Sequence, residues 1–248
     1  MKILCVFPHP DDETIFAGGT ILRHIKSGDE VIWICASLGG RGGNSQRRSS
    51  KIFYYLFSLI GKFPALLVLQ KVAVYWLGIF RRKNMKLAKI RKQEAENVAG
   101  IFGMEKVIFL EISDMRFGWD KKMINQKIKA NLEKLQPDVV YTLHPNGVTG
   151  HPDHVALSRY VTEAIKDMEG RAPRLRYITF SKEIARKYKL PLLGISENDI
   201  SEKIELSLEE LKIKRQVIEV YQSQNYLWGI FLEKYPELLQ EEYFLELV

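Results

Sequence analysis

The residues best suited to chemistry lie in two short motifs that are far apart in the chain. Residues 8–13 read PHPDDE, and residues 151–154 read HPDH. A catalytic zinc ion usually takes three protein ligands from imidazole and carboxylate side chains and keeps a further position for water. His9, Asp12 and His154 would supply such a set. The two motifs together predict a catalytic metal centre, with zinc as the expected ion and another divalent cation as the alternative.

The other polar residues of the motifs are candidates for proton transfer and charge stabilisation. The adjacent carboxylates of Asp11 and Asp12 are costly side by side unless a cation neutralises one of them, which leaves the other free as a general base. His151 and His154 stand three residues apart at the start of an expected helix. Both can therefore face one crevice, one toward the metal and the other toward a substrate carbonyl oxygen. A structural alternative stays open, because PDDE and HPDH also suit helix N-termini.

The elements expected to position these motifs alternate between strand and helix. Apolar runs predict strands at 2–7, 30–37, 107–110, 139–143, 175–180, 203–206 and 243–248. Helical periodicity predicts helices at 13–27, 87–102, 123–135, 151–168 and 208–222. This alternation predicts an α/β fold, a Rossmann-like and mostly parallel sheet with helices on both faces. Ligands of such sheets bind beyond the carboxyl ends of the strands, where both motifs fall.

Composition bounds the class of protein. A chain of 248 residues with 46% hydrophobic residues can build one large core, so we expect a single domain over 1–248. The formal net charge of +7 suits an acidic partner or a membrane surface. Cys5 and Cys35 lie in apolar strand-like runs, which disfavours a disulfide framework and, with no signal-peptide pattern, predicts a cytoplasmic location. The sequence carries no nucleic-acid-binding signature, so no such partner is expected.

One apolar insertion, at about 48–84, does not fit the alternating pattern. Residues 52–80 are almost continuously apolar and aromatic, with basic clusters on both sides. Pro64 and internal lysines divide the run into pieces that are short for a spanning helix, which needs about 20 apolar residues. We expect a helical hairpin that contacts a membrane surface or covers the site; packing on the core or in a subunit interface is the alternative.

Both motifs resemble the signatures of the PIG-L/LmbE-like family of zinc-dependent deacetylases, which remove acetyl groups from N-acetylglucosamine units of glycoconjugates. Further similar segments are GGT at 18–20, RKQE at 91–94, SD at 113–114, Lys214, and SQ at 223–224. The resemblance implies that His9, Asp12 and His154 bind zinc. It also implies that Asp11 is the general base, that His151 stabilises the oxyanion, and that Arg91 and Asp114 hold the sugar or a neighbouring group.

The chain departs from the family pattern at Gly40, Thr149 and Tyr221. These departures concern the expected contacts with the sugar and leave the expected metal ligands unchanged. The insertion is absent or shorter in the other members considered, which suggests a lipid-linked sugar as substrate. The alternatives are a metal-dependent amidase or esterase acting on a non-sugar acyl group and a catalytically silent glycolipid-binding protein. The oligomeric state is not predicted.

Overall fold

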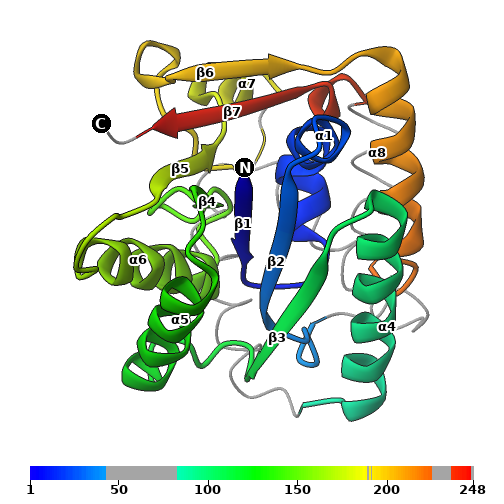
Figure 1. Cartoon of the computed structure of the whole chain (residues 1–248). Coiled ribbons are helices and arrows are strands. Elements are labelled where there is room, and N and C mark those ends of the chain that lie inside the picture. The colour runs from blue at the N-terminus through cyan, green and yellow to red at the C-terminus, as the bar shows by residue number, and fades with distance from the viewer. Residues whose placement is uncertain (43–82, 189, 191, 225–235, 247–248) are drawn as a thin grey trace.

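The chain forms an α/β fold in a computed structural model (Figure 1). The structure describes residues 1–42, 83–188, 190, 192–224 and 236–246. The apolar run predicted to form a hairpin, at 52–80, lies outside these residues. Its predicted contact with a membrane or with the site therefore stays a prediction.

The elements of the described chain follow the predicted alternation. Its strands are β1 (Lys2–Phe7), β2 (Glu30–Ser37), β3 (Lys106–Ile112), β4 (Val139–Leu143), β5 (Arg174–Thr179), β6 (Glu202–Glu205) and β7 (Glu241–Glu246). Its α-helices are α1 (Asp12–Lys26), α4 (Met85–Phe102), α5 (Lys121–Leu135), α6 (Pro152–Lys166), α7 (Lys182–Lys187) and α8 (Leu208–Val220). Two short 3-10 helices, η1 (Glu197–Asp199) and η2 (Pro236–Leu239), complete the set.

The strands form one seven-stranded sheet in the order β3-β2-β1-β4-β5-β7-β6. Strands β1 to β5 pair in parallel, whereas β7 runs antiparallel to both β5 and β6. The chain moves from β1 outward through β2 to β3, then returns to place β4 on the other side of β1. The β1/β4 boundary is therefore the topological switch point, the usual ligand site of such sheets. The predicted fold class is confirmed.

Helices cover both faces of the sheet, and each face has its own apolar core (Figure 1). One cluster packs alternate residues of β1, such as Ile3 and Phe7, against α1, α4 and α8. The other packs the intervening residues, such as Leu4 and Val6, against α5 and α6. Burial on both faces explains why the parallel strands read as continuous apolar runs rather than as alternating ones.

A buried ion pair joins α1, α8 and β7. The Nζ of Lys214 lies 2.6 Å from Oε1 of Glu242, and both side chains are 1% exposed. Glu242 also accepts hydrogen bonds from the backbone N–H groups of Gly19 and Thr20, both at 2.8 Å. The lysine charge and the donors on α1 thus compensate the cost of burying this carboxylate, which would otherwise be several kcal/mol.

No helix in the described part of the chain has both the length and the apolar character needed to cross a membrane.

The packing of α1 against Leu206 predicts how replacement of a glycine in this helix changes the stability of the protein, and a glycine of α4 serves as the control. A Cβ on Gly19 would lie 2.0 Å from Cδ2 of Leu206, a side chain that is 2% exposed, so Leu206 would have to shift within the core. The substitution Gly19→Ala should therefore lower the free energy of unfolding by about 1–3 kcal/mol. The matched control Gly100→Ala, in α4 with open space around it, should raise it by about 0.5–1 kcal/mol.

Urea unfolding followed by circular dichroism measures both changes. A Gly19→Ala protein as stable as wild type would show that α1 does not pack on Leu206 as described.

Candidate metal centre

The two motifs meet because the strands that precede them are neighbours. His9 follows β1, His151 follows β4, and β1 pairs with β4 through partners such as Ile3 with Val139 and Cys5 with Tyr141. The first motif then starts α1 at Asp12, and the second starts α6, with the side chain of His151 accepting from the backbone N–H of Asp153 as a helix cap. Helix N-termini thus present both motifs at the same edge of the sheet.

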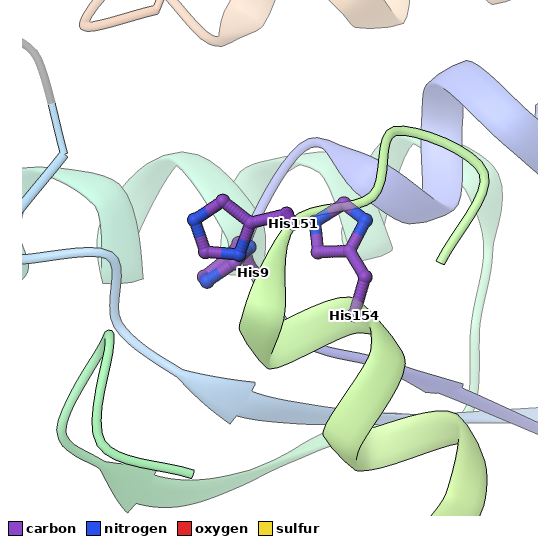
Figure 2. A group of neighbouring side chains, drawn as sticks. All are labelled: His9, His151 and His154. Atoms are coloured by element: carbon purple, nitrogen blue, oxygen red, sulfur yellow. The ribbon is translucent and has the colours of Figure 1, made fainter. Parts of the chain in front are cut away.

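Three imidazole rings gather at this edge. Figure 2 shows His151 and His154 on the first turn of α6, with His9 beside them. One nitrogen from each ring lies within 4.8 Å of the others, and the ring centroids are 5.0–5.2 Å apart. This arrangement suits one bound cation, because a metal ion needs several nitrogen or oxygen atoms around a common centre.

Asp12 adds a carboxylate to the imidazole cluster. Its Oδ2 lies 3.3 Å from Nδ1 of His9 and 3.5 Å from Nε2 of His154, and the side chain is buried. The structure therefore brings together the predicted ligands His9, Asp12 and His154, and it places His151 close enough to be a fourth candidate. Which of the four bind the ion stays a prediction.

The hydrogen bonds of each ring indicate which nitrogen is left for a metal. Nδ1 of His154 faces the carbonyl oxygen of Gly147 at 3.1 Å and must donate to it, which leaves the lone pair on Nε2, toward Asp12. Nε2 of His9 faces Oδ2 of Asp153 at 3.2 Å, so its Nδ1 is left on the Asp12 side. Contacts of this kind fix the tautomer of metal-binding histidines. The residues present therefore fit a divalent cation.

The loop before α6 owes its shape to a glycine. Gly147 has φ 76°, and a Cβ there would come within 3.1 Å of the Cβ of His154. The close approach lets the Gly147 carbonyl reach the ring of His154. Thr149, also in this loop, places its hydroxyl 3.3 Å from the same Nδ1.

The electrostatics of the cluster favour a positive charge between its carboxylates. Burial disfavours a charged ring at His9, but hydrogen bonds to Asp12 and Asp153 outweigh it and raise the pKa of His9 to about 10. Burial also disfavours ionised Asp12, yet the nearby rings of His154 and His9 lower its pKa to about 2. A metal ion bound here would provide the same neutralising charge that the proton on His9 provides.

His151 differs from its neighbours. Burial, together with the neighbouring rings of His9 and His154, lowers the pKa of His151 to about 3. The ring is therefore neutral near pH 7. Because its Nδ1 accepts from the N–H of Asp153 at 3.2 Å, the neutral ring carries its proton on Nε2 and can act as a hydrogen-bond donor there.

Asp11, the predicted general base, is buried beside the cluster. Its carboxylate Oδ2 lies 3.4 Å from Nη2 of Arg91, which also donates to the carbonyl oxygen of Pro10 at 2.5 Å. The residue has φ 105° and ψ −33° at the N-cap of α1, a conformation that residues other than glycine seldom adopt. Arg91 therefore fixes both the peptide before Asp11 and its carboxylate.

The predicted sugar contacts, Arg91 and Asp114, are 4% and 5% exposed and already have protein partners. Asp114 accepts from the hydroxyl of Ser37 and, at 2.7 Å, from the backbone N–H of Arg41. It thus holds the end of β2 and the loop that follows. Contact of either residue with a sugar stays a prediction.

Three functional candidates were missed in the sequence: Glu13, Asp153 and Tyr221. Asp153 accepts from His9 and, at 2.7 Å, from the backbone N–H of Met115, so it orients a predicted metal ligand. Asp153 could have been found from the sequence, because it lies between the two histidines of the HPDH motif. Glu13 accepts from the hydroxyl of Tyr221 at 2.5 Å, a contact across the chain that no local pattern reveals.

Fold and geometry thus define a Rossmann-like α/β protein with a cluster of metal-binding type at its switch point. Residues 4–165, more than half of the chain, match the model of the PIG-L family, described as GlcNAc-PI de-N-acetylase. The chain belongs to this family, as its motifs predicted.

Comparisons with individual proteins agree with the family and the fold. The chain is 29% identical over 168 residues to a probable N-acetyl-α-D-glucosaminyl L-malate deacetylase 2 of Bacillus cereus, an alignment that covers 67% of this chain and 61% of that protein. The chain thus spans less than two thirds of this relative.

Among solved structures, the fold is similar to that of the N,N'-diacetylchitobiose deacetylase of Pyrococcus horikoshii, with a TM-score of 0.67 at 21% identity, over 99% of this chain and 83% of that one. It is also similar to GalB, the 4-carboxy-2-hydroxymuconate hydratase of Pseudomonas putida, with a TM-score of 0.65 at 18% identity, over 100% of this chain and 96% of that one. At these identities the likeness concerns the fold alone.

The metal-ligand set can be tested by removing one imidazole. Because Nε2 of His154 points to Asp12, the variant His154→Ala should lose most of the bound zinc after loading and desalting. His24→Ala is the matched control: its ring bonds Asp29 and Tyr141 in a different part of the fold, so zinc content should not change. Metal analysis by mass spectrometry gives the zinc-to-protein ratio, and full zinc content in His154→Ala would contradict the assignment.

Proposed function

We propose that this chain hydrolyses the N-acetyl group of an N-acetylglucosamine unit in a glycoconjugate and releases acetate and a free amino sugar. The observation that carries the proposal is the meeting of His9, Asp12 and His154 around one point, with Asp11 directly before Asp12 at the N-cap of α1. Membership of the PIG-L family and the activity named for the Bacillus cereus relative support the choice of substrate class.

Zinc is the proposed ion, and His9, Asp12 and His154 are its proposed ligands. When bound, zinc supplies a Lewis acid that polarises a carbonyl group and makes water more acidic. Two imidazoles and one carboxylate with a position left for water are a common catalytic zinc set. Asp153 keeps the ring of His9 oriented through its carboxylate, and Gly147 does so for His154 through its carbonyl.

Asp11 is assigned the proton transfer, and His151 is assigned the stabilisation of the negative charge that develops on the carbonyl oxygen. Asp11 would accept the proton of the attacking water: it directly precedes Asp12 in the chain, and its carboxylate lies 3.4 Å from Nη2 of Arg91, a charge that favours its ionised form. His151 would donate a hydrogen bond from Nε2 to the carbonyl oxygen of the acetyl group as negative charge develops there. A neutral ring suits this task, because it donates without adding charge to a site that already contains a cation. Asp11, which then carries the proton taken from water, can deliver it to the leaving amine.

The substrate we propose is lipid-linked, and the protein is proposed to act in the cytoplasm at a membrane surface. The support is in the sequence, where residues 52–80 are apolar and aromatic with arginines and lysines on both sides. Apolar side chains flanked by basic ones bind anionic membrane surfaces. Both cysteines are free and buried, as expected in a reducing compartment.

The reaction is tested by acetate release from zinc-loaded protein with N-acetylglucosamine conjugates. Wild-type protein should release acetate. Asp11→Asn, which keeps the shape but not the basicity, should lower kcat by about 10²–10⁴-fold while zinc content is retained. The exposed Asp167→Asn is the control and should be as active as wild type. Wild-type protein that releases no acetate from any conjugate would overturn the proposal, whereas an active Asp11→Asn would overturn only the base assignment.

Membrane contact is tested by sedimentation with vesicles that contain anionic phospholipid at low salt. Full-length protein should bind, and protein without residues 51–83 should stay in the supernatant, because its apolar and basic side chains are removed together. Equal partitioning of the two proteins, with the shortened one still active on a water-soluble conjugate, would rule out this part of the proposal.

A further inference from the structure

Asp11 has a backbone conformation that the rest of the structure must maintain. A non-glycine residue at φ 105° is strained, and it persists only where the surrounding structure determines its conformation. Asp11 is the N-cap residue of α1, which begins at the next residue, so this conformation sets the direction in which the Asp11 side chain leaves the backbone. If the constraint were loosened, the carboxylate would be free to turn with the backbone.

Arg91 holds one side of this residue, and Glu13 holds the other. The backbone N–H of Asp11 donates to Oε2 of Glu13 at 3.1 Å. Glu13 is fully buried, and its other oxygen, Oε1, accepts from the hydroxyls of Thr14 and Tyr221, each at 2.5 Å. The orientation of this carboxylate therefore determines where the N–H of Asp11 can point.

Tyr221 connects this arrangement to a distant part of the chain. It is fully buried at the C-cap of α8, whereas Thr14 is the immediate neighbour of Glu13 on α1. In the described chain, the Tyr221 hydroxyl thus links the Glu13 side chain, on α1, to the end of α8. The packing of α8 on α1 sets the position of this hydroxyl.

We propose that Glu13 and Tyr221 are positioning residues for Asp11: the tyrosine hydroxyl fixes the Glu13 carboxylate, which in turn holds the Asp11 peptide so that its side chain points at the metal centre. The inference rests on the proposed function, since it assigns Asp11 the role of base. Neither residue touches the substrate. Small displacements of a catalytic group are costly, and a shift of about 1 Å can lower a rate about 100-fold.

The test is a pair of tyrosine variants in the zinc-loaded, full-length protein. Tyr221→Phe removes only the hydroxyl and should lower kcat for acetate release about 10-fold or more, with KM within about twofold of wild type and zinc content unchanged. Tyr177→Phe is the matched control. It also removes a buried tyrosine hydroxyl, which bonds Thr162 at 2.6 Å, and it should leave both kinetic constants unchanged.

A second comparison separates positioning from a general effect on the fold. In an Asp11→Asn background the base is absent, so adding Tyr221→Phe should lower the residual rate less than twofold. A loss of stability alone would instead lower the rate by the same factor in both backgrounds. Glu13→Gln should keep more activity than Glu13→Ala, because the amide oxygen can still accept from the Asp11 N–H while the amide group donates to Tyr221.

The outcomes distinguish the two proposals. Wild-type kcat in Tyr221→Phe, an equal loss in Tyr177→Phe, or the same fold-loss in the Asp11→Asn background would each overturn the positioning role while leaving the deacetylase proposal intact. Glu13→Gln no more active than Glu13→Ala would do so as well. Absence of acetate release from wild-type protein would instead overturn the proposed function.

Discussion

The parallel pairing of β1 with β4 is the constraint on which the site depends. It places the ends of two strands side by side although more than a hundred residues separate them in the chain. Each strand is followed by a histidine motif and then by a helix, so the helix N-termini converge at the same edge. Apolar packing on both faces of the sheet keeps β1 and β4 in register and so keeps the two motifs in contact.

Around this edge the chain buries several ionisable groups that are tolerable only together. Asp12 and Asp153 flank the ring of His9, while Arg91 faces Asp11. Each carboxylate would be costly to bury alone, and each is compensated by a positive or donating partner. Away from the site, the buried ammonium of Lys214 on α8 likewise offsets the cost of burying the Glu242 carboxylate on β7. The hydrogen bond from the Tyr221 hydroxyl to Glu13 connects the edge with the two motifs to the packing of α8 on α1.

Much of the fold was predictable because its signals are local. Buried strands on both sides of β1 read as apolar runs, and α5 and α6 carry clear helical periodicity. The helix α7, at Lys182–Lys187, was missed because six residues are too few to display a period. The meeting of the two histidine motifs was predictable because strand ends of a parallel sheet share one edge. The contact of Glu13 with Tyr221 was not predictable, because it depends on how α8 packs on α1. The hydrogen bonds that Asp114 accepts from Ser37 and Arg41 were not predictable either, because they depend on how the loops after β2 and β3 meet.

We assign the metal to His9, Asp12 and His154, with His151 left to face the substrate. Anomalous X-ray scattering at the zinc absorption edge, from crystals of the zinc-loaded protein, tests it most directly. One strong anomalous peak is expected about 2.0–2.2 Å from nitrogens of His9 and His154 and from an oxygen of Asp12. A peak ligated by His9, His151 and His154 without Asp12, or a peak elsewhere in the molecule, would contradict it.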